Sequence, residues 1–162
     1  MTPLRICLDY LDSVGVCYTH VSDAAESAAN GVAETVVLKG DAQYMLVVIP
    51  AESYVEIGKV RAVVGAGNLR FATEHEMAAL FPFGEVEWVP PLGGLAGGVP
   101  VYLDREIADR ESVAFNACTS HDLIHMRTAD FQRIAPTVIG SFSATDYKKE
   151  FSRALLAKGA GA

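Results

Sequence analysis

The stretch Thr35-Val-Val-Leu-Lys39, a polar turn at Gly40-Asp-Ala42, and Tyr44-Met-Leu-Val-Val-Ile49 carry the clearest fold signal in the sequence. Two runs rich in β-branched and aromatic residues around a polar turn predict a β-hairpin. Both runs are apolar at successive positions and do not alternate. We therefore expect strands that are buried on both faces near the middle of a sheet. Lys39 ends the first strand, at a position where a lysine is usually solvated.

Outward from this hairpin, helix caps and apolar periodicity predict helices separated by short strands. Thr2, Thr73 and Thr128 are the expected N-caps, and Thr73-x-x-Glu76 has the pattern of a capping box. The predicted helices span residues 2–15, 22–30, 52–64, 73–81, 128–134 and 146–158, and the predicted short strands span 16–21, 68–71, 99–103, 112–115 and 123–126. Residues 104–111 read as a charged turn, and the chain from 136 to 144 reads as irregular.

Composition limits the possible classes of protein. A chain of 162 residues fits a single domain, 1–162, and 51% apolar with 20% charged residues is a globular composition. The net charge of −7 argues against broad electrostatic binding to a polyphosphate, so we expect no DNA partner, and any nucleic acid must be held by local contacts. No apolar run reaches the ~18 residues of a membrane span, and no secretory signal is visible. We expect a cytoplasmic protein without a membrane partner.

A glycine-rich segment between two predicted strands is the first candidate site. In Pro90-Pro-Leu-Gly-Gly-Leu-Ala-Gly-Gly-Val-Pro100, the four glycines let a ligand approach the main chain without meeting a Cβ atom. Loops of this kind can aim N–H groups at an anion or a polarised carbonyl. The alternative is a flexible connection between strands. The candidate substrate-binding residues here are Gly93, Gly94, Gly97, Gly98 and Pro100.

The polar run Asn116-Ala-Cys-Thr-Ser-His-Asp122 is the second candidate, either as a pocket wall or as a hydrogen-bonded turn. Cys118 and His121 could act as nucleophile and base, although no positive setting for a thiolate is visible and a structural cysteine is the simpler interpretation. His121 and His125 would lie about 13 Å apart on a strand, and no third ligand has suitable spacing. We expect no metal and no cofactor.

The remaining ionisable residues give weaker indications. Cys7, Cys17 and Cys118 are odd in number and form no C-x-x-C pair, which favours buried thiols over a disulfide framework. Paired carboxylates for acid–base chemistry are not apparent, because Glu74 and Glu76 read as one solvated helix face.

The order of several motifs resembles the YbaK family, the prolyl-tRNA-synthetase-associated editing domains. The residues that carry the resemblance are Thr35-Val-Val-Leu-Lys39, Pro90-Pro-Leu-Gly93, Gly98-Val-Pro-Val-Tyr-Leu-Asp104, Phe115-Asn-Ala and Asp130-Phe131. The match runs from about residue 16 to 134, which leaves 135–162 as a C-terminal extension. No single motif is diagnostic, but the ordered set is specific.

The resemblance implies a small α/β domain with a mixed, curved sheet flanked by helices, and hydrolysis of the ester of mischarged aminoacyl-tRNAs. It also implies that Lys39 helps to hold the tRNA 3′ end, and that the Gly93–Pro100 segment presents backbone groups to the aminoacyl moiety. The terminal ribose hydroxyl would help to activate the water. Arg61, Arg70, Lys148, Lys149 and Arg153 could add weak contacts, although a solvated role is simpler for them.

Two departures from the family pattern are visible. The Gly93–Pro100 segment is one residue longer than the common form, and the polar wall reads Asn116, Ser120 and His121 where the family has other arrangements. The leading hypothesis is a free-standing aminoacyl-tRNA deacylase, with an aminoacyl-tRNA synthetase as a further partner. The alternatives are a non-catalytic module that recognises an aminoacyl end, a nucleotide or a synthetase, and a hydrolase that uses Cys118 and His121.

Overall fold

The computed structural model describes residues 2–22, 32–65, 67–135 and 137–145. At its centre is the predicted hairpin, formed by β2 (Val32–Lys39) and β3 (Tyr44–Pro50), with Lys39 opposite Tyr44. The Gly40 N–H donates to the Gln43 carbonyl at 2.8 Å and closes the turn. Every residue of β3 after Tyr44 is buried, which confirms the prediction for this strand, whereas β2 is only half-buried from Glu34 to Val36.

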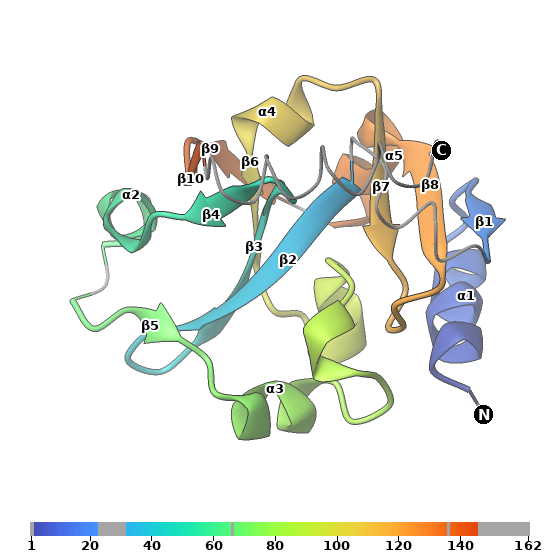
Figure 1. Ribbon diagram of the computed structural model, residues 1–162, viewed down its shortest axis with the longest axis horizontal. Helices are drawn as coiled ribbons and strands as arrows, with labels where there is room; N and C mark the ends of the chain where they lie inside the picture. The colour runs from blue at the N-terminus through green and yellow to red at the C-terminus, as the bar shows by residue number, and fades with distance from the viewer. Residues whose placement is uncertain (1, 23–31, 66, 136, 146–162) are drawn as a thin grey trace, which may run out of the picture.

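Eight strands of the described chain form one mixed sheet in the order β1-β8-β7-β2-β3-β6-β9, with β5 paired to the end of β2 (Figure 1). β2 runs parallel to β7, and β3 runs parallel to β6, so both hairpin strands have neighbours from the second half of the chain. The added strands are β1 (Thr19–Val21), β5 (Arg70–Phe71), β6 (Val101–Asp104), β7 (Ser112–Asn116), β8 (Leu123–Arg127) and β9 (Thr137–Gly140).

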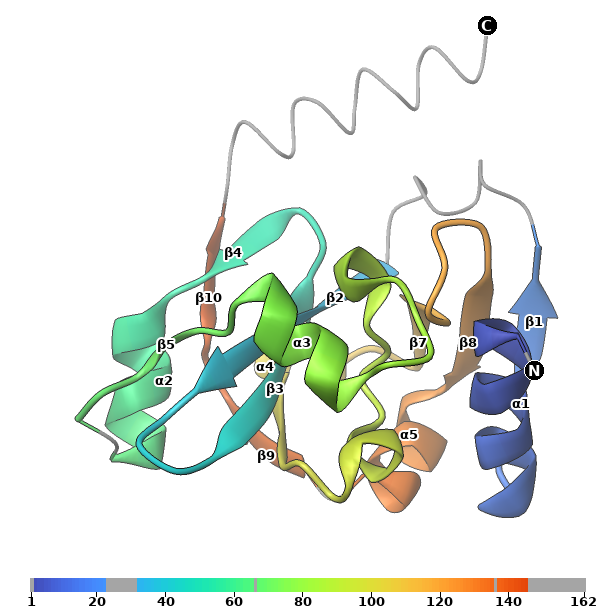
Figure 2. The ribbon, with the colours of Figure 1, turned by 90° about the horizontal axis from the view of Figure 1, so that it is seen from below.

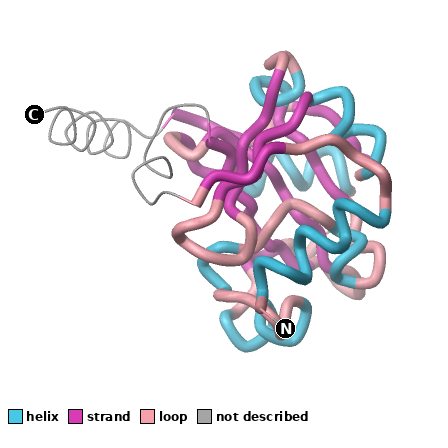
Figure 3. The backbone as a smooth tube through the Cα atoms, turned by 90° about the vertical axis from the view of Figure 1, so that its right-hand side faces the viewer, coloured by secondary structure: helices cyan, strands magenta, loops and turns pink. Residues whose placement is uncertain are grey.

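Two apolar clusters cover the two faces of the sheet. The larger cluster joins α1 (Pro3–Ser13), the end of α3 (Glu74–Leu80) and α5 (Thr128–Ile134) to β3, β6 and β7. The smaller cluster lies beneath α2 (Ile57–Val64) on the other face. Figure 2 shows α3 lying across the hairpin, and Figure 3 shows the strands as one layer flanked by helices. The expected α/β fold, a mixed sheet flanked by helices, is therefore confirmed.

A separate two-stranded sheet, in which β10 (Ser143–Thr145) pairs with β4 (Ser53–Val55), lies beside the smaller apolar cluster. Asp104, only 2% exposed, connects it to the main sheet. One carboxylate oxygen accepts the Glu106 N–H at 3.0 Å, and the other accepts the Phe142 N–H at 3.0 Å and the Ser143 hydroxyl at 2.9 Å. Asp104 thereby caps α4 (Arg105–Ala108) and fixes the segment that leads into β10.

Several local predictions agree with the structure. Thr2 caps α1, and Gly15, with φ of 72°, follows the end of that helix. Thr73 and Glu76 form the complete capping box of α3. The strands predicted around residues 16–21, 68–71, 99–103, 112–115 and 123–126 are present, with bounds moved by one to three residues.

Other local predictions are wrong. Residues 53–55 form β4 and not the start of a helix, because they pair with β10; the helix begins at Ile57. The charged turn at 104–111 contains α4, whose cap is Asp104. The chain after 136 is not irregular but contributes β9 and β10. Arg127, not Thr128, occupies the N-cap position of α5, and the buried Thr128 hydroxyl has no hydrogen-bond partner among the described residues.

Two predicted helices, 22–30 and 146–158, fall almost entirely outside the described residues. The cysteine prediction is right for Cys7 and Cys118, which are buried, and wrong for Cys17, which is exposed. No helix in the described part of the chain has the length and apolar character needed to cross a membrane.

Candidate functional site

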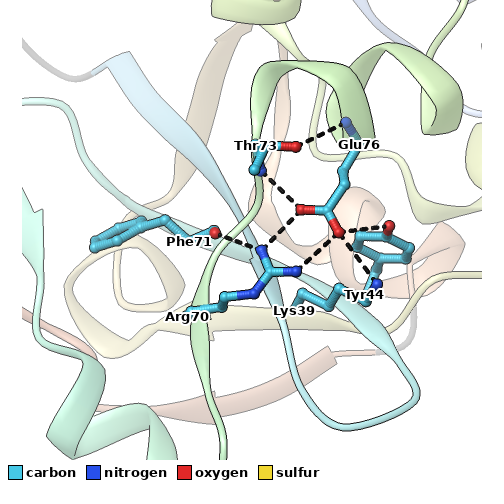
Figure 4. A network of polar contacts seen from close by, with 6 residues as sticks. All are labelled: Lys39, Tyr44, Arg70, Phe71, Thr73 and Glu76. Atoms are coloured by element: carbon cyan, nitrogen blue, oxygen red, sulfur yellow. Dashed lines mark hydrogen bonds and ion pairs between the residues drawn. The ribbon is translucent and has the colours of Figure 1, made fainter.

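Glu76 links the hairpin to α3 through a network of charged side chains (Figure 4). Because the capping box turns its side chain back toward the helix N-terminus, the carboxylate accepts the Thr73 N–H at 2.9 Å. Arg70 donates to its two oxygens at 2.8 and 2.9 Å. Lys39 and the Tyr44 hydroxyl donate to one of these oxygens at 3.1 and 3.2 Å. A helix cap thus positions the two cations that end β2 and begin β5.

The network fixes the charges of its members at neutral pH. The hydrogen bonds from Arg70 and the Thr73 backbone hold the pKa of the Glu76 carboxyl well below its usual range, even though desolvation opposes them. The hydrogen bond to Glu76 raises the pKa of Lys39, whose ammonium also lies 5.2 Å from the centre of the Tyr44 ring. The Glu76 side chain is 16% exposed, which corrects its prediction as part of a solvated face.

A hollow of about 560 Å³ opens beside this network. We call it the cationic hollow because three of its lining residues are basic and one is acidic. It is lined by Lys39, Gly40, Asp41, Arg61, Gly67, Asn68, Leu69 and Arg70. The pairing of β5 with the end of β2 places Arg70 opposite Lys39, and the last turn of α2 supplies Arg61.

The glycine segment is compact. Gly93 begins the 3-10 helix η3 (Gly93–Ala96), and its carbonyl accepts the N–H groups of Gly97, Gly98 and Val99. These three N–H groups are therefore already bonded to the protein. A Cβ atom at Gly93 would collide with the Val99 carbonyl, and one at Gly94 would collide with the Tyr10 ring of α1.

The last residues of the segment differ in their environment. Gly97 and Gly98 have φ of 77° and 91° and face open space. The Pro100 carbonyl accepts the Leu46 N–H at 3.0 Å, which fixes the end of the segment to β3.

The polar run is a hydrogen-bonded turn between β7 and β8. Asn116, 8% exposed, donates to the Thr119 carbonyl at 3.1 Å. The Asp122 carboxylate accepts the Thr119 hydroxyl at 2.6 Å and contacts His20 of β1 at 2.7 Å. Burial raises the pKa of Asp122, but the hydrogen bonds from Thr119 and His20 outweigh it and lower the pKa below its ordinary value. His121 is exposed and Ser120 is half-buried.

The predicted site residues form two groups. Lys39 and the end of the glycine segment are both joined to β3, at Tyr44 and Leu46. The polar run begins at the end of β7. In the parallel pairing of β7 with β2, Phe115 is the partner of Ala33, so Asn116 lies beside Glu34. From there to Lys39 is about 16 Å along β2. The structure therefore does not bring Asn116 next to Lys39.

Sequence reasoning missed Glu76, and the signal that could have found it was present. A capping box directs the N3 carboxylate back to the helix start, and Arg70 precedes Thr73 by three residues. The contribution of His20 had no such local signal, because its partner lies 102 residues away. No group of three His, Cys, Asp or Glu in the described residues could hold a metal ion.

Comparison with known proteins assigns the chain to a family. The model of the aminoacyl-tRNA editing domain matches residues 18–134. The chain therefore belongs to the aminoacyl-tRNA editing domain family, a class of domain with a role in tRNA editing.

Among solved structures, a candidate trans-editing enzyme for prolyl-tRNA synthetase matches with a TM-score of 0.76 and 20% identity, over 89% of this chain and 98% of that one. A scaffold used for computational grafting of epitope backbones matches with a TM-score of 0.76 and 18% identity, over 90% and 99%. A candidate signal transduction protein from Marinobacter aquaeolei VT8 matches with a TM-score of 0.72 and 15% identity, over 86% of this chain and 30% of that one. At these identities the likeness concerns the fold alone. A search of curated protein sequences finds no match.

Proposed function

We propose that this protein is an aminoacyl-tRNA deacylase that acts in trans on the ester of mischarged tRNA. The single observation that carries the proposal is the family match, which spans residues 18–134 and thus includes the hairpin, the glycine segment and the polar turn. Lys39 supports it, because its charged ammonium is held in place beside the cationic hollow, where the 3′ end of an acidic polymer can be held by local contacts.

The proposed catalysis is substrate-assisted, with the terminal ribose hydroxyl helping to activate water. His20 has a carboxylate partner, but the same ring nitrogen faces Asp122 at 2.7 Å and the Ser22 hydroxyl at 3.4 Å. A relay needs different partners on the two nitrogens, so this trio does not have the geometry of a catalytic triad. His121, the candidate base predicted from the sequence, is exposed.

A deacylation screen over a panel of mischarged tRNAs tests the proposal. We expect one or more of them to be hydrolysed, and Lys39→Ala to lower that rate by about 10²-fold with little change in fold, as for the loss of one positioned electrostatic contact. A tRNA whose terminal adenosine lacks the free neighbouring hydroxyl should bind similarly and react far more slowly. His121→Ala should cost less than Lys39→Ala. Undiminished turnover of the deoxy substrate, with a folded but inactive His121→Ala protein, would show that the protein carries its own base.

A second candidate function is a non-catalytic module that binds the aminoacyl end, a nucleotide or a synthetase. The observation that favours it is the use of the Gly97, Gly98 and Val99 N–H groups by the Gly93 carbonyl, since N–H groups bonded inside the protein do not meet an oxyanion. Tight binding of charged tRNA without hydrolysis of any member of the panel would decide for this candidate.

A further inference from the structure

The two cations held by Glu76 keep unused hydrogen-bond donors. An ammonium group has three N–H donors and a guanidinium group has five. Within the described ranges, Lys39 uses one of its donors on Glu76, so two remain. Arg70 uses three on described residues, namely Phe71 and the two oxygens of Glu76, so two remain for this part of the chain. The carboxylate therefore fixes the positions of both cations without exhausting their capacity to bind an anion.

Arg61 stands apart from this network. It lies in the last turn of α2, is exposed, and has no hydrogen bond or ion pair with any residue in the described ranges. The left-handed Gly65, with φ of 77°, ends the helix, and residues 67–70 then line the same hollow as Arg61. An arginine without a protein partner is free to turn its planar set of donors toward a ligand.

The local charge is opposite to the charge of the whole chain. The lining of the cationic hollow contains Lys39, Arg61 and Arg70 against Asp41, a formal charge of +2, and the Glu76 carboxylate that contacts Lys39 and Arg70 reduces it to +1, whereas the chain carries −7. In an acidic protein, such a concentration of positive charge in a concave surface focuses the field on a small anionic group. Lysine and arginine donors around a polar hollow match the oxygens of a phosphate.

We infer that the cationic hollow binds a backbone phosphodiester of the RNA strand that leads to the aminoacylated 3′ end, with a phosphate contact from Arg61, whose side chain has no partner among the described residues. This inference rests on the proposed function. Lys39 pairs with Tyr44 of β3, and Leu46 of the same strand donates to the Pro100 carbonyl, so β3 connects the hollow to the end of the glycine segment. The ligand class is a phosphodiester, and its proposed source is the RNA single strand.

Arg61→Ala and Arg61→Lys, with Arg127→Ala as the matched control, test the inference. Arg127 is also exposed, belongs to β8 at the opposite side of the sheet from β5, and forms no side-chain bond with the described residues (Figure 1). The probe is an uncharged RNA oligonucleotide ending in single-stranded CCA, with Kd measured at several salt concentrations. Each phosphate contact on a single strand contributes about 0.7 to the slope of log Kd against log salt.

We expect Arg61→Ala to lower that slope by about 0.7. Over the tenfold range from 1 M to 0.1 M salt, this change in slope corresponds to a Kd about five-fold higher at 0.1 M. Arg61→Lys should keep the slope, and Arg127→Ala should match the wild type. An unchanged slope in Arg61→Ala, or an equal loss in Arg127→Ala, would overturn the inference. Inorganic phosphate is the competitor in a second measurement. If it displaces the RNA as effectively as unlabelled RNA does at the same concentration of phosphate groups, the hollow binds a free anion and the inference is overturned.

The binding measurement is independent of hydrolysis. If the wild-type protein hydrolyses no charged tRNA but shows the Arg61-dependent slope, phosphate binding by the hollow is supported and the proposed deacylase activity is refuted. If the wild-type protein hydrolyses a charged tRNA but Arg61→Ala keeps the wild-type slope, the deacylase activity is supported and phosphate binding by the hollow is refuted.

Discussion

Glu76 shows how one side chain can serve both stability and electrostatics. It completes the capping box of α3 and at the same time accepts hydrogen bonds from Arg70 and Lys39. The N-terminus of a helix favours a negative charge, and two cations add to that preference. The carboxylate is therefore the point at which α3, β2 and β5 are tied together.

Glu76→Gln should lower the midpoint of urea unfolding at pH 7, because the amide keeps the shape but loses the charge. The folded-state pKa of Glu76 lies below its ordinary value of 4.5, so its contribution is complete above that value and is lost as the pH falls toward the folded pKa. The stability difference between variant and wild type should shrink as the pH falls below about 4.5.

Glu74→Gln is the control for this change, since Glu74 is exposed in the same helical turn and is outside the network. A pH-independent difference between Glu76→Gln and the wild type from pH 7 to pH 3 would contradict the assignment of the charge to Glu76.

Cys118 is the residue that would decide between ester hydrolysis by water and by a protein thiol. It is 1% exposed, adopts φ of 71°, and lies where a Cβ atom on Gly84 would meet its side chain. His121, its proposed base, is exposed. Cys118→Ser preserves the size of the side chain and should retain most of the hydrolysis of charged tRNA, and activity should survive chelators. A folded but inactive Cys118→Ser protein would instead support the thiol as nucleophile.

At the scale of elements, the glycine segment depends on close packing with its neighbours. Gly93→Ala should be more destabilising than Gly94→Ala, because the added methyl meets the Val99 backbone in the first case and the end of the Tyr10 side chain in the second. We expect about 1–3 kcal/mol for overpacking at Gly94, measured by denaturant unfolding. The double variant Gly94→Ala/Tyr10→Ala should show a favourable coupling. Simple additivity of the two single changes would mean that the segment does not pack on α1.

Asp104 connects two sheets and a helix by its carboxylate. Asp104→Ala should cost about 2–4 kcal/mol in the free energy of unfolding, because the Phe142 N–H, with its side chain in the core, loses its acceptor and α4 loses its cap. Asp109→Ala, at an exposed position just after the same helix, should stay within about 0.5 kcal/mol of the wild type. Equal effects of the two substitutions would show that the buried hydrogen bonds do not matter.

For the molecule as a whole, the sequence predicts best those features that depend on residues close together in the chain. The hairpin, the cap at Thr2, and the capping box at Thr73 were predictable, because each depends on residues within a few positions of one another. β4 and β10 were not, since each is a strand only through pairing with a segment about 90 positions away. Strands of three residues carry too little periodicity to be recognised alone.

The candidate site follows the same rule. Lys39 and the glycines could be selected from sequence, but the cationic hollow could not, because it exists only when β5 pairs with β2 and α2 ends beside them. Arg61 and Arg70 look like ordinary surface arginines in the sequence. Only their tertiary placement, together with the carboxylate of Glu76, distinguishes them from the other basic residues.

The parallel pairings of the central hairpin also have a consequence during synthesis of the chain on the ribosome. β2 and β3 are complete at residue 50, but their parallel neighbours β6 and β7 end only at residues 104 and 116. At about 5–20 residues per second, the outer edges of this apolar hairpin stay uncovered for roughly 3 to 13 seconds. Unpaired edges are where nascent chains associate wrongly. The yield of the protein should therefore depend on translation speed and on chaperones that shield newly made strands.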